Sequence, residues 1–172
     1  MKLRTANLFG ALATAVAGQL AQAARSHPNQ TDTGTAALNL IALFEGCSNN
    51  DLSRALQLSH SATVRLIDKL EVDGLVNRHD AKDRRAVALH LTPLGKRAAE
   101  TALKARCAAL SDLVERLSDA QRAALDDIAA TLLKHMTQSP LEAAHICRLC
   151  DHVACPEVDC PVHKKALELS AA

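Results

Sequence analysis

DLSRALQLSHSATVRLIDKLEVDGLVNRHDAKDRRAVALHLT, residues 51–92, is the stretch of this 172-residue chain that decides its fold. It opens with a pattern that predicts a short helix over 51–56, with the two preceding asparagines as candidate caps. After a two-residue turn, Ser59 is a good N-cap for a second helix. Gly74 ends that helix, because glycine commonly occupies the position just beyond a helix C-terminus. The stretch therefore predicts two helices joined by a tight turn.

The second helix has two contrasting faces. Ala62, Leu66 and Leu70 are spaced i, i+4 and i+8, which places them on one apolar line with Ile67 beside it. The other face carries polar and cationic residues, namely His60, Ser61, Thr63, Arg65 and Lys69. The major groove of duplex DNA accepts side chains of these kinds, so we take these five as candidate DNA contacts. The alternatives are phosphate contacts for the two cations and plain helix surface for the others.

Two strand-like runs follow the helix pair. Residues 75–78 and 87–91 are apolar or alternating, and the polar segment 80–85 between them contains three cations. A hairpin with Arg84 and Arg85 at its tip suits a minor groove or the phosphates beside it, so both are candidate DNA contacts. The alternative for such a run of charge is a solvated hairpin tip.

These features resemble the MarR family of winged helix-turn-helix regulators. The resemblance is carried by LSRALQLSHSATVRLIDKLEVDGLVNR (52–78) and by DRRAVALHLTPLG (83–95), and it extends over roughly residues 5–137. It implies a mainly α fold with a small β-wing, in which a winged helix-turn-helix is flanked by N- and C-terminal dimerisation helices. It also implies that Asp83 stabilises the wing by pairing with an arginine.

The chain divides into four predicted segments. Residues 1–30 form an N-terminal dimerisation helix, 31–92 the winged helix-turn-helix, and 93–138 the C-terminal dimerisation helices, while 139–172 form a cysteine-rich tail. Within the third segment, Thr92 and Pro93 are suited to the N-cap and first position of a long helix that extends to about Leu117. Ser118 then opens another helix through a capping box and that helix ends near Met136.

The first residues, MKLRTANLFGALATAVAGQLAQAA, have two interpretations. Two cations, an apolar run and Ala21-Gln22-Ala23 are typical of a secretory signal, which predicts export with residues 1–23 removed. As a helix, the same segment places Leu8, Leu12 and Leu20 near one stripe, as a dimerisation helix requires. We favour the helix and a cytoplasmic protein, because export would serve no purpose for a DNA-binding motif. The segment has too few strongly apolar residues for a membrane span.

Composition excludes several function classes. The chain has two Phe, no Trp and no Tyr, which argues against the aromatic platforms that stack single-stranded bases. Its net charge is +1, so DNA affinity must come from local patches and from doubling the domain in a homodimer. No nucleophile–His–carboxylate motif, H-E-x-x-H or Gly-rich phosphate loop is present, which predicts that the chain is not an enzyme.

The tail PLEAAHICRLCDHVACPEVDCPVHKK, residues 140–165, departs from the plain family pattern. It places four cysteines at a C-x2-C-x4-C-x4-C spacing: Cys147, Cys150, Cys155 and Cys160. Thiolates at short spacing suit Zn²⁺ or, alternatively, an iron–sulfur cluster, with His145, His152 and His163 as further candidate ligands. Thiol switching, a haem thiolate and a disulfide are the remaining alternatives. A cytoplasmic setting argues against the disulfide.

The sequence therefore predicts a DNA-binding transcriptional regulator, expected to be a repressor, that binds palindromic operators as a homodimer. It predicts a response to metal, redox state or a small molecule, and no cofactor besides the candidate metal. The alternative is a metal-binding interaction module in which the helix-turn-helix is a vestigial scaffold.

Overall fold

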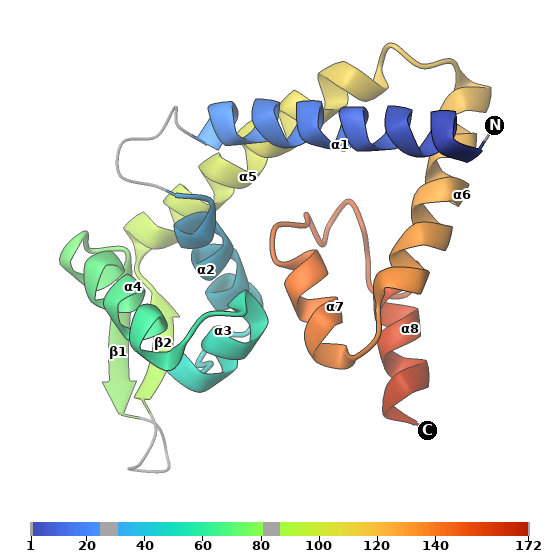
Figure 1. The fold of residues 1–172 in the computed structure, drawn as a ribbon. Helices are drawn as coiled ribbons and strands as arrows, with labels where there is room; N and C mark the ends of the chain where they lie inside the picture. Colours follow the sequence, from blue (N-terminus) through green and yellow to red (C-terminus); the bar gives the residue numbers. More distant parts are fainter. Residues whose placement is uncertain (1, 25–30, 81–86, 172) are drawn as a thin grey trace.

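The computed structural model describes residues 2–24, 31–80 and 87–171 (Figure 1). It confirms a mostly helical chain with one small antiparallel sheet. The elements in chain order are α1 (Lys2–Ala24), α2 (Asp32–Leu43), α3 (Asn49–Leu56), α4 (His60–Val72), β1 (Val76–Asp80), β2 (Val87–Leu91), α5 (Pro93–Val114), α6 (Asp119–Met136), α7 (Pro140–Cys147) and α8 (Pro161–Ser170).

The main hydrophobic core lies within the winged lobe, which comprises α2, α3, α4, β1, β2 and the start of α5. Helix α2 is at its centre, because Leu38 and Ile41 are completely buried. Leu52 of α3, Ile67 of α4 and Leu89 of β2 pack into the same cluster. Burying a leucine or isoleucine side chain contributes about 1.5–3 kcal/mol, so these contacts hold the helix pair rigidly against the sheet.

Caps define the two helices of the turn. Ser48, not either asparagine after it, is the N-cap of α3, and it forms a capping box with Asp51, so the sequence-based cap assignment was wrong. Gln57 takes a left-handed conformation with φ 56°, which turns the chain sharply toward α4. Ser59 accepts from the backbone of Ala62 and caps α4 as predicted. The turn is therefore fixed by backbone geometry on both sides.

The wing strands pair antiparallel, with Val76 opposite Leu91 and Asp80 opposite Val87. Strand β1 begins one residue later than predicted and extends to Asp80, which lies two residues beyond the predicted end. Gly74 has φ 69° and lets the chain turn from α4 into β1. Gly95, in the first turn of α5, lies so close to Leu75 that an added Cβ would be 1.9 Å from the Leu75 carbonyl oxygen. This approach locks α5 onto the lobe.

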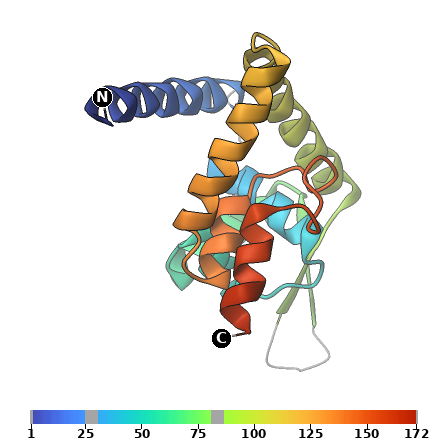
Figure 2. The ribbon, with the colours of Figure 1, turned by 90° about the vertical axis from the view of Figure 1, so that its right-hand side faces the viewer.

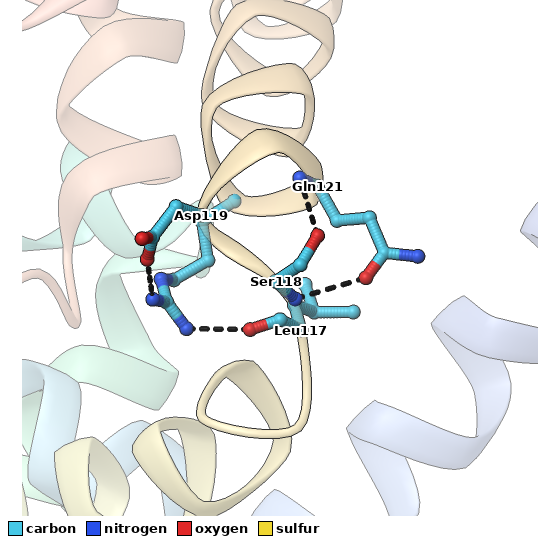
Figure 3. A network of polar contacts seen from close by, with 5 residues as sticks. Leu117, Ser118, Asp119 and Gln121 are labelled. Carbon is cyan, nitrogen blue, oxygen red and sulfur yellow. Dashed lines mark hydrogen bonds and ion pairs between the residues drawn. The ribbon is translucent and has the colours of Figure 1, made fainter.

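Helices α1, α5 and α6 form long arms outside the lobe. Helix α1 lies along α5, and Figure 2 shows it projecting away from the rest of the chain. Helix α5 ends at Val114, three residues before the predicted end. Figure 3 shows the junction that follows, where the Ser118 backbone donates to Gln121 at 2.9 Å and the Ser118 hydroxyl accepts from the Gln121 backbone at 3.3 Å. This predicted capping box is confirmed.

The C-terminal tail forms α7 and α8, which contact each other. In Figure 1, α7 lies between the lobe and α8, while α8 lies beside α6. Contacts of α7 with α3 and of α8 with α6 support both placements. In the described part of the chain, no helix has the length and apolar character that crossing a membrane requires.

Candidate nucleic-acid interface

Helix α4 presents a polar edge at the surface of the lobe. Its buried face is formed by Thr63, Ile67 and Leu70 rather than by the predicted line through Ala62 and Leu66, which are half-buried. The helix is therefore rotated by about one position from the sequence-based assignment. Exposed on the opposite side are four of the five predicted contacts: His60, Ser61, Arg65 and Lys69.

Thr63 must be removed from the predicted DNA contacts. Its side chain is completely buried, and its hydroxyl donates to the Ser59 carbonyl one turn earlier at 3.1 Å. A threonine can satisfy its hydroxyl in this way inside a helix and then pack its methyl group with apolar neighbours. Sequence spacing alone did not separate this position from the exposed serine two residues before it.

The N-terminus of α4 is held by polar contacts with the preceding helix. His60 Nδ1 lies 3.1 Å from Oδ1 of Asn50 on α3. The Ser61 and Ser59 hydroxyls lie 3.2 Å apart. These contacts orient two exposed polar side chains at the end of the helix that a groove meets first.

Arg78 of β1 holds the wing against α4 and was missed by sequence reasoning. One guanidinium nitrogen donates to Asp68 at 2.6 Å and the other to Glu71 at 2.5 Å. A forked guanidinium suits two carboxylates at once. The sequence signal that could have indicated this contact is a pair of acids spaced i and i+3 on α4, followed by a strand that carries an arginine. Asp68 and Glu71 are therefore engaged with Arg78. The two cations of α4, Arg65 and Lys69, form no ion pair among the described residues.

The base of the wing is described, but its tip is not. His79 and His90 stack edge to face across the strands, with ring centroids 5.1 Å apart. His90 also lies 3.5 Å from a carboxylate oxygen of Glu45 at the end of α2. Arg84, Arg85 and Asp83 fall outside the described residues, so their predicted roles stay predictions.

The four tail cysteines are brought to one region. Cys147 ends α7, Cys160 precedes α8, and Cys150 and Cys155 lie in the connection. All four line a single cavity of about 280 Å³ between α2, α7 and α8. All of the cysteines are free thiols. Sequence positions separated by up to thirteen residues therefore meet in space.

The thiols of this group influence one another's ionisation. The pKa of Cys150 is lowered to about 7, chiefly because its sulfur is hydrogen-bonded to Cys147, with Arg106 and Arg148 adding positive charge nearby. The pKa of Cys147 is raised well above its usual range by the same pairing and by burial. Burial and the neighbouring Cys160 raise the pKa of Cys155 to about 11. Of these three thiols, Cys150 is therefore the one that ionises most readily.

The three candidate histidine ligands differ in their surroundings. His145 is engaged elsewhere, with Nδ1 3.1 Å from the Ala55 carbonyl oxygen of α3. His163 faces Glu157 at 3.9 Å. His152 lines the thiol cavity, and its Nε2 is buried without a hydrogen-bond partner. Over residues 2–24, 31–80 and 87–171, no three Cys, His, Asp or Glu side chains are already arranged to hold a metal ion.

Comparison with known proteins agrees with this architecture. The MarR family model matches residues 31–86, which include α2, α3, α4 and β1. A regulatory protein assigned to the hcr operon of Thauera aromatica is 33% identical over 104 residues, which are 60% of this chain and 63% of that protein. The HTH-type transcriptional regulator YwhA of Bacillus subtilis is 30% identical over 96 residues, 55% of this chain and 69% of that protein. The chain thus spans a little under two thirds of the Thauera regulator.

Solved structures extend the similarity beyond the winged lobe. A MarR family protein from Bacillus stearothermophilus is 27% identical with a TM-score of 0.68, and the match covers 80% of this chain and 99% of that one. FabT of Streptococcus pneumoniae, solved in complex with DNA, is 17% identical with a TM-score of 0.70 over 78% and 96% of the two chains.

A helix-turn-helix with a two-stranded wing, mounted on long helical arms, defines the class of winged helix regulators. This chain belongs to the MarR family of transcriptional regulators. The family and these relatives are regulators and not enzymes, which confirms the prediction that the chain is not an enzyme.

Proposed function

We propose that the chain represses transcription by binding palindromic duplex DNA as a homodimer, with α4 of each copy in the major groove. The observation that carries this proposal is the two-sided nature of α4. Thr63, Ile67 and Leu70 anchor one face in the core, while Arg65 and Lys69 are exposed on the other without ion-pair partners among the described residues. A rigidly held helix with free cations is what groove binding requires.

The homodimer is supported by apolar surface on the arms. On α6, Leu125, Ile128 and Leu132 follow i, i+3 and i+7 spacing and are all exposed. On α1, Leu8 and Leu12 are each more than half exposed. Contiguous apolar stripes of this kind mark interaction surfaces, and a second copy would cover both. The paired arms would place two α4 helices about one turn of DNA apart.

The wing is proposed to contact DNA beside each α4 helix. Arg78 ties β1 to α4, so the strands and the helix approach DNA as one body. Arg84 and Arg85 follow in the hairpin and would supply the minor-groove or phosphate contacts. FabT, which shares the fold, was solved in complex with DNA, and this also supports DNA binding as the function of this architecture.

A small molecule is proposed to regulate this binding from a cavity between α2 and α5. The cavity has a volume of about 300 Å³, and Ile41 and Leu103 form part of its wall. Glu45, Lys96 and Glu100 add charged groups. A ligand bound there would change the angle between the lobe and the arms. It would thereby change the spacing of the two α4 helices.

Selection of duplexes from a random pool by the full-length protein tests the proposal. We expect a palindrome whose half-sites are centred about one helical turn apart, bound by two chains. Recovery of sequences without two-fold symmetry, or complexes with one chain per duplex, would contradict it. Transcription from a promoter carrying the selected site should fall when the protein is supplied, and a rise would exclude repression.

A further inference from the structure

The cysteine-rich tail contains a second site that DNA binding does not use. We propose that Cys147, Cys150, Cys155 and Cys160 bind one Zn²⁺ ion, and that this ion ties the winged lobe to helix α6. The proposal is independent of DNA binding, because it rests on the tail and on the elements that the tail contacts.

The four tail cysteines lie around one cavity. Cys147 and Cys155 pack with the buried Cys160 in one small hydrophobic cluster, and Cys150 lines the same cavity as these three. Four thiols at one cavity suit a single ion, because a tetrahedral zinc site holds its four ligands at about 2.3 Å from the metal. An iron–sulfur cluster is itself several ångströms across and would hold the sulfurs farther apart. Among the described residues no three of these side chains surround a common point, so binding would require the thiols to rotate toward one another about their side-chain bonds.

The charge of such a zinc site must be balanced by its surroundings. Four thiolates around Zn²⁺ carry a net negative charge, which requires nearby donors or cations. His152, whose buried Nε2 has no partner, lines the same cavity and would supply a donor toward the sulfurs. An unpartnered buried imidazole is costly, and a charged site beside it would remove that cost.

The two parts of the cysteine group are attached to different parts of the fold. The turn that carries Cys150 is fixed to the lobe, whereas Cys147 packs in the small cluster with Cys160. Asn39 of α2 is almost fully buried and donates to the carbonyls of Arg148 and Cys150 at 2.9 and 3.3 Å. Leu149 between them packs against the main core.

The half with Cys155 and Cys160 belongs to the opposite side of the tail. Cys160 is the N-cap residue of α8, and it forms no side-chain hydrogen bond as a cap. Helix α8 packs along α6, and Leu133 of α6 joins the small core around Val162. An ion shared by the two halves would therefore connect the α2–α3 surface of the lobe to the α6 arm.

Metal content is the first test. The full-length protein is purified without oxygen, supplied with zinc, desalted and measured by mass spectrometry of metals, with Cys155→Ser beside Cys107→Ser as the matched control. We expect about one zinc per chain in the wild type and the control, and at least a fivefold loss in Cys155→Ser. Zinc below about a tenth of an equivalent in the wild type, iron in its place, or equal zinc in the two variants would overturn the proposal.

Hydrogen exchange is the second test and needs no variant. Removing zinc from the wild type with a chelator should raise amide exchange in residues 150–160 and at the start of α8, while β1 and β2 stay unchanged. Restoring zinc should reverse the change. Unchanged exchange in residues 150–160, or a fall in mass of two hydrogens that shows a disulfide in place of metal, would refute the zinc link.

Discussion

The winged lobe and the helical arms bury their apolar side chains very differently. In the lobe, α2 contributes a run of buried residues from Ala36 to Ile41. In the arms, α6 has no buried residue at all, although Ile128 and Leu132 lie on one face. The lobe completes its core within one chain, whereas the arms leave apolar surface that only another molecule can cover.

Because of this difference, the stability of the lobe and the stability of the arms should depend on different interactions. The lobe should remain folded in a single chain, because its core and its caps are internal. The arms should depend on association, and their stability should rise with protein concentration.

Gly95→Ala should damage the lobe most. The new Cβ would lie 1.9 Å from the Leu75 carbonyl oxygen, so α5 or the backbone just before β1 must move. Overpacking against backbone costs roughly 1–3 kcal/mol or more, and we expect about 3 kcal/mol less stability in denaturant unfolding. Gly10→Ala on α1, where the added atom meets nothing within 4 Å, is the control and should be neutral or slightly stabilising. Equal unfolding midpoints for the two variants would show that the approach is not tight.

Ile128→Asp should damage the arms and spare the lobe. The side chain is 53% exposed in one chain, so the substitution costs little there, but a carboxylate would be buried in a paired interface. We expect the dimer to weaken by about 2–3 kcal/mol in sedimentation experiments while the far-ultraviolet helix signal of the lobe persists. Asp126→Asn, on the same helix, is the control. A monomeric wild type would remove the basis for this prediction.

Arg65→Ala should weaken DNA binding without affecting either kind of stability. Arg65 is exposed on α4 and forms no ion pair among the described residues. Loss of one good groove contact costs about 1–3 kcal/mol, measured as affinity for the selected duplex at physiological salt. Arg116→Ala, which removes the same charge just beyond the C-terminal end of α5, should leave affinity unchanged. An unchanged affinity of Arg65→Ala for the duplex would show that α4 is not the DNA-contacting surface.

Asp51→Asn should have the smallest effect, on the cap of α3. The Ser48 hydroxyl and backbone lower the pKa of Asp51 below 3.8, so its contribution is present at neutral pH and is lost as pH falls through that lowered pKa. We expect about 0.5–1 kcal/mol of destabilisation at pH 7. The difference from wild type should disappear in strong acid. A gap that stays constant down to pH 2 would contradict a role for the carboxylate charge.

Much of the lobe could be predicted from sequence because it is encoded locally. Ser59, Gly74 and the Thr92-Pro93 pair set their helix ends through short-range bonds and backbone preference, and the structure agrees at each. The rotation of α4 was not predictable in this way. Threonine can be polar surface or, with its hydroxyl bonded to the preceding turn, part of the core, so Thr63 depends on the tertiary fit.

Long-range contacts were also beyond the sequence. The cysteine spacing indicated a common site, but nothing local indicated that Asn39 would hold the Cys150 loop from 111 residues away. Likewise, the Arg78 fork depends on how β1 meets α4. Such contacts depend on how whole helices and strands pack together, and this packing cannot be predicted from a single sequence.

If paired chains insert α4 into successive major grooves, a hydroxyl-radical footprint on the selected duplex will reveal it. We expect two protected patches related by two-fold symmetry and centred about one helical turn apart, both fading with Arg65→Ala. A single patch, or protection that Arg65→Ala leaves intact, would contradict it.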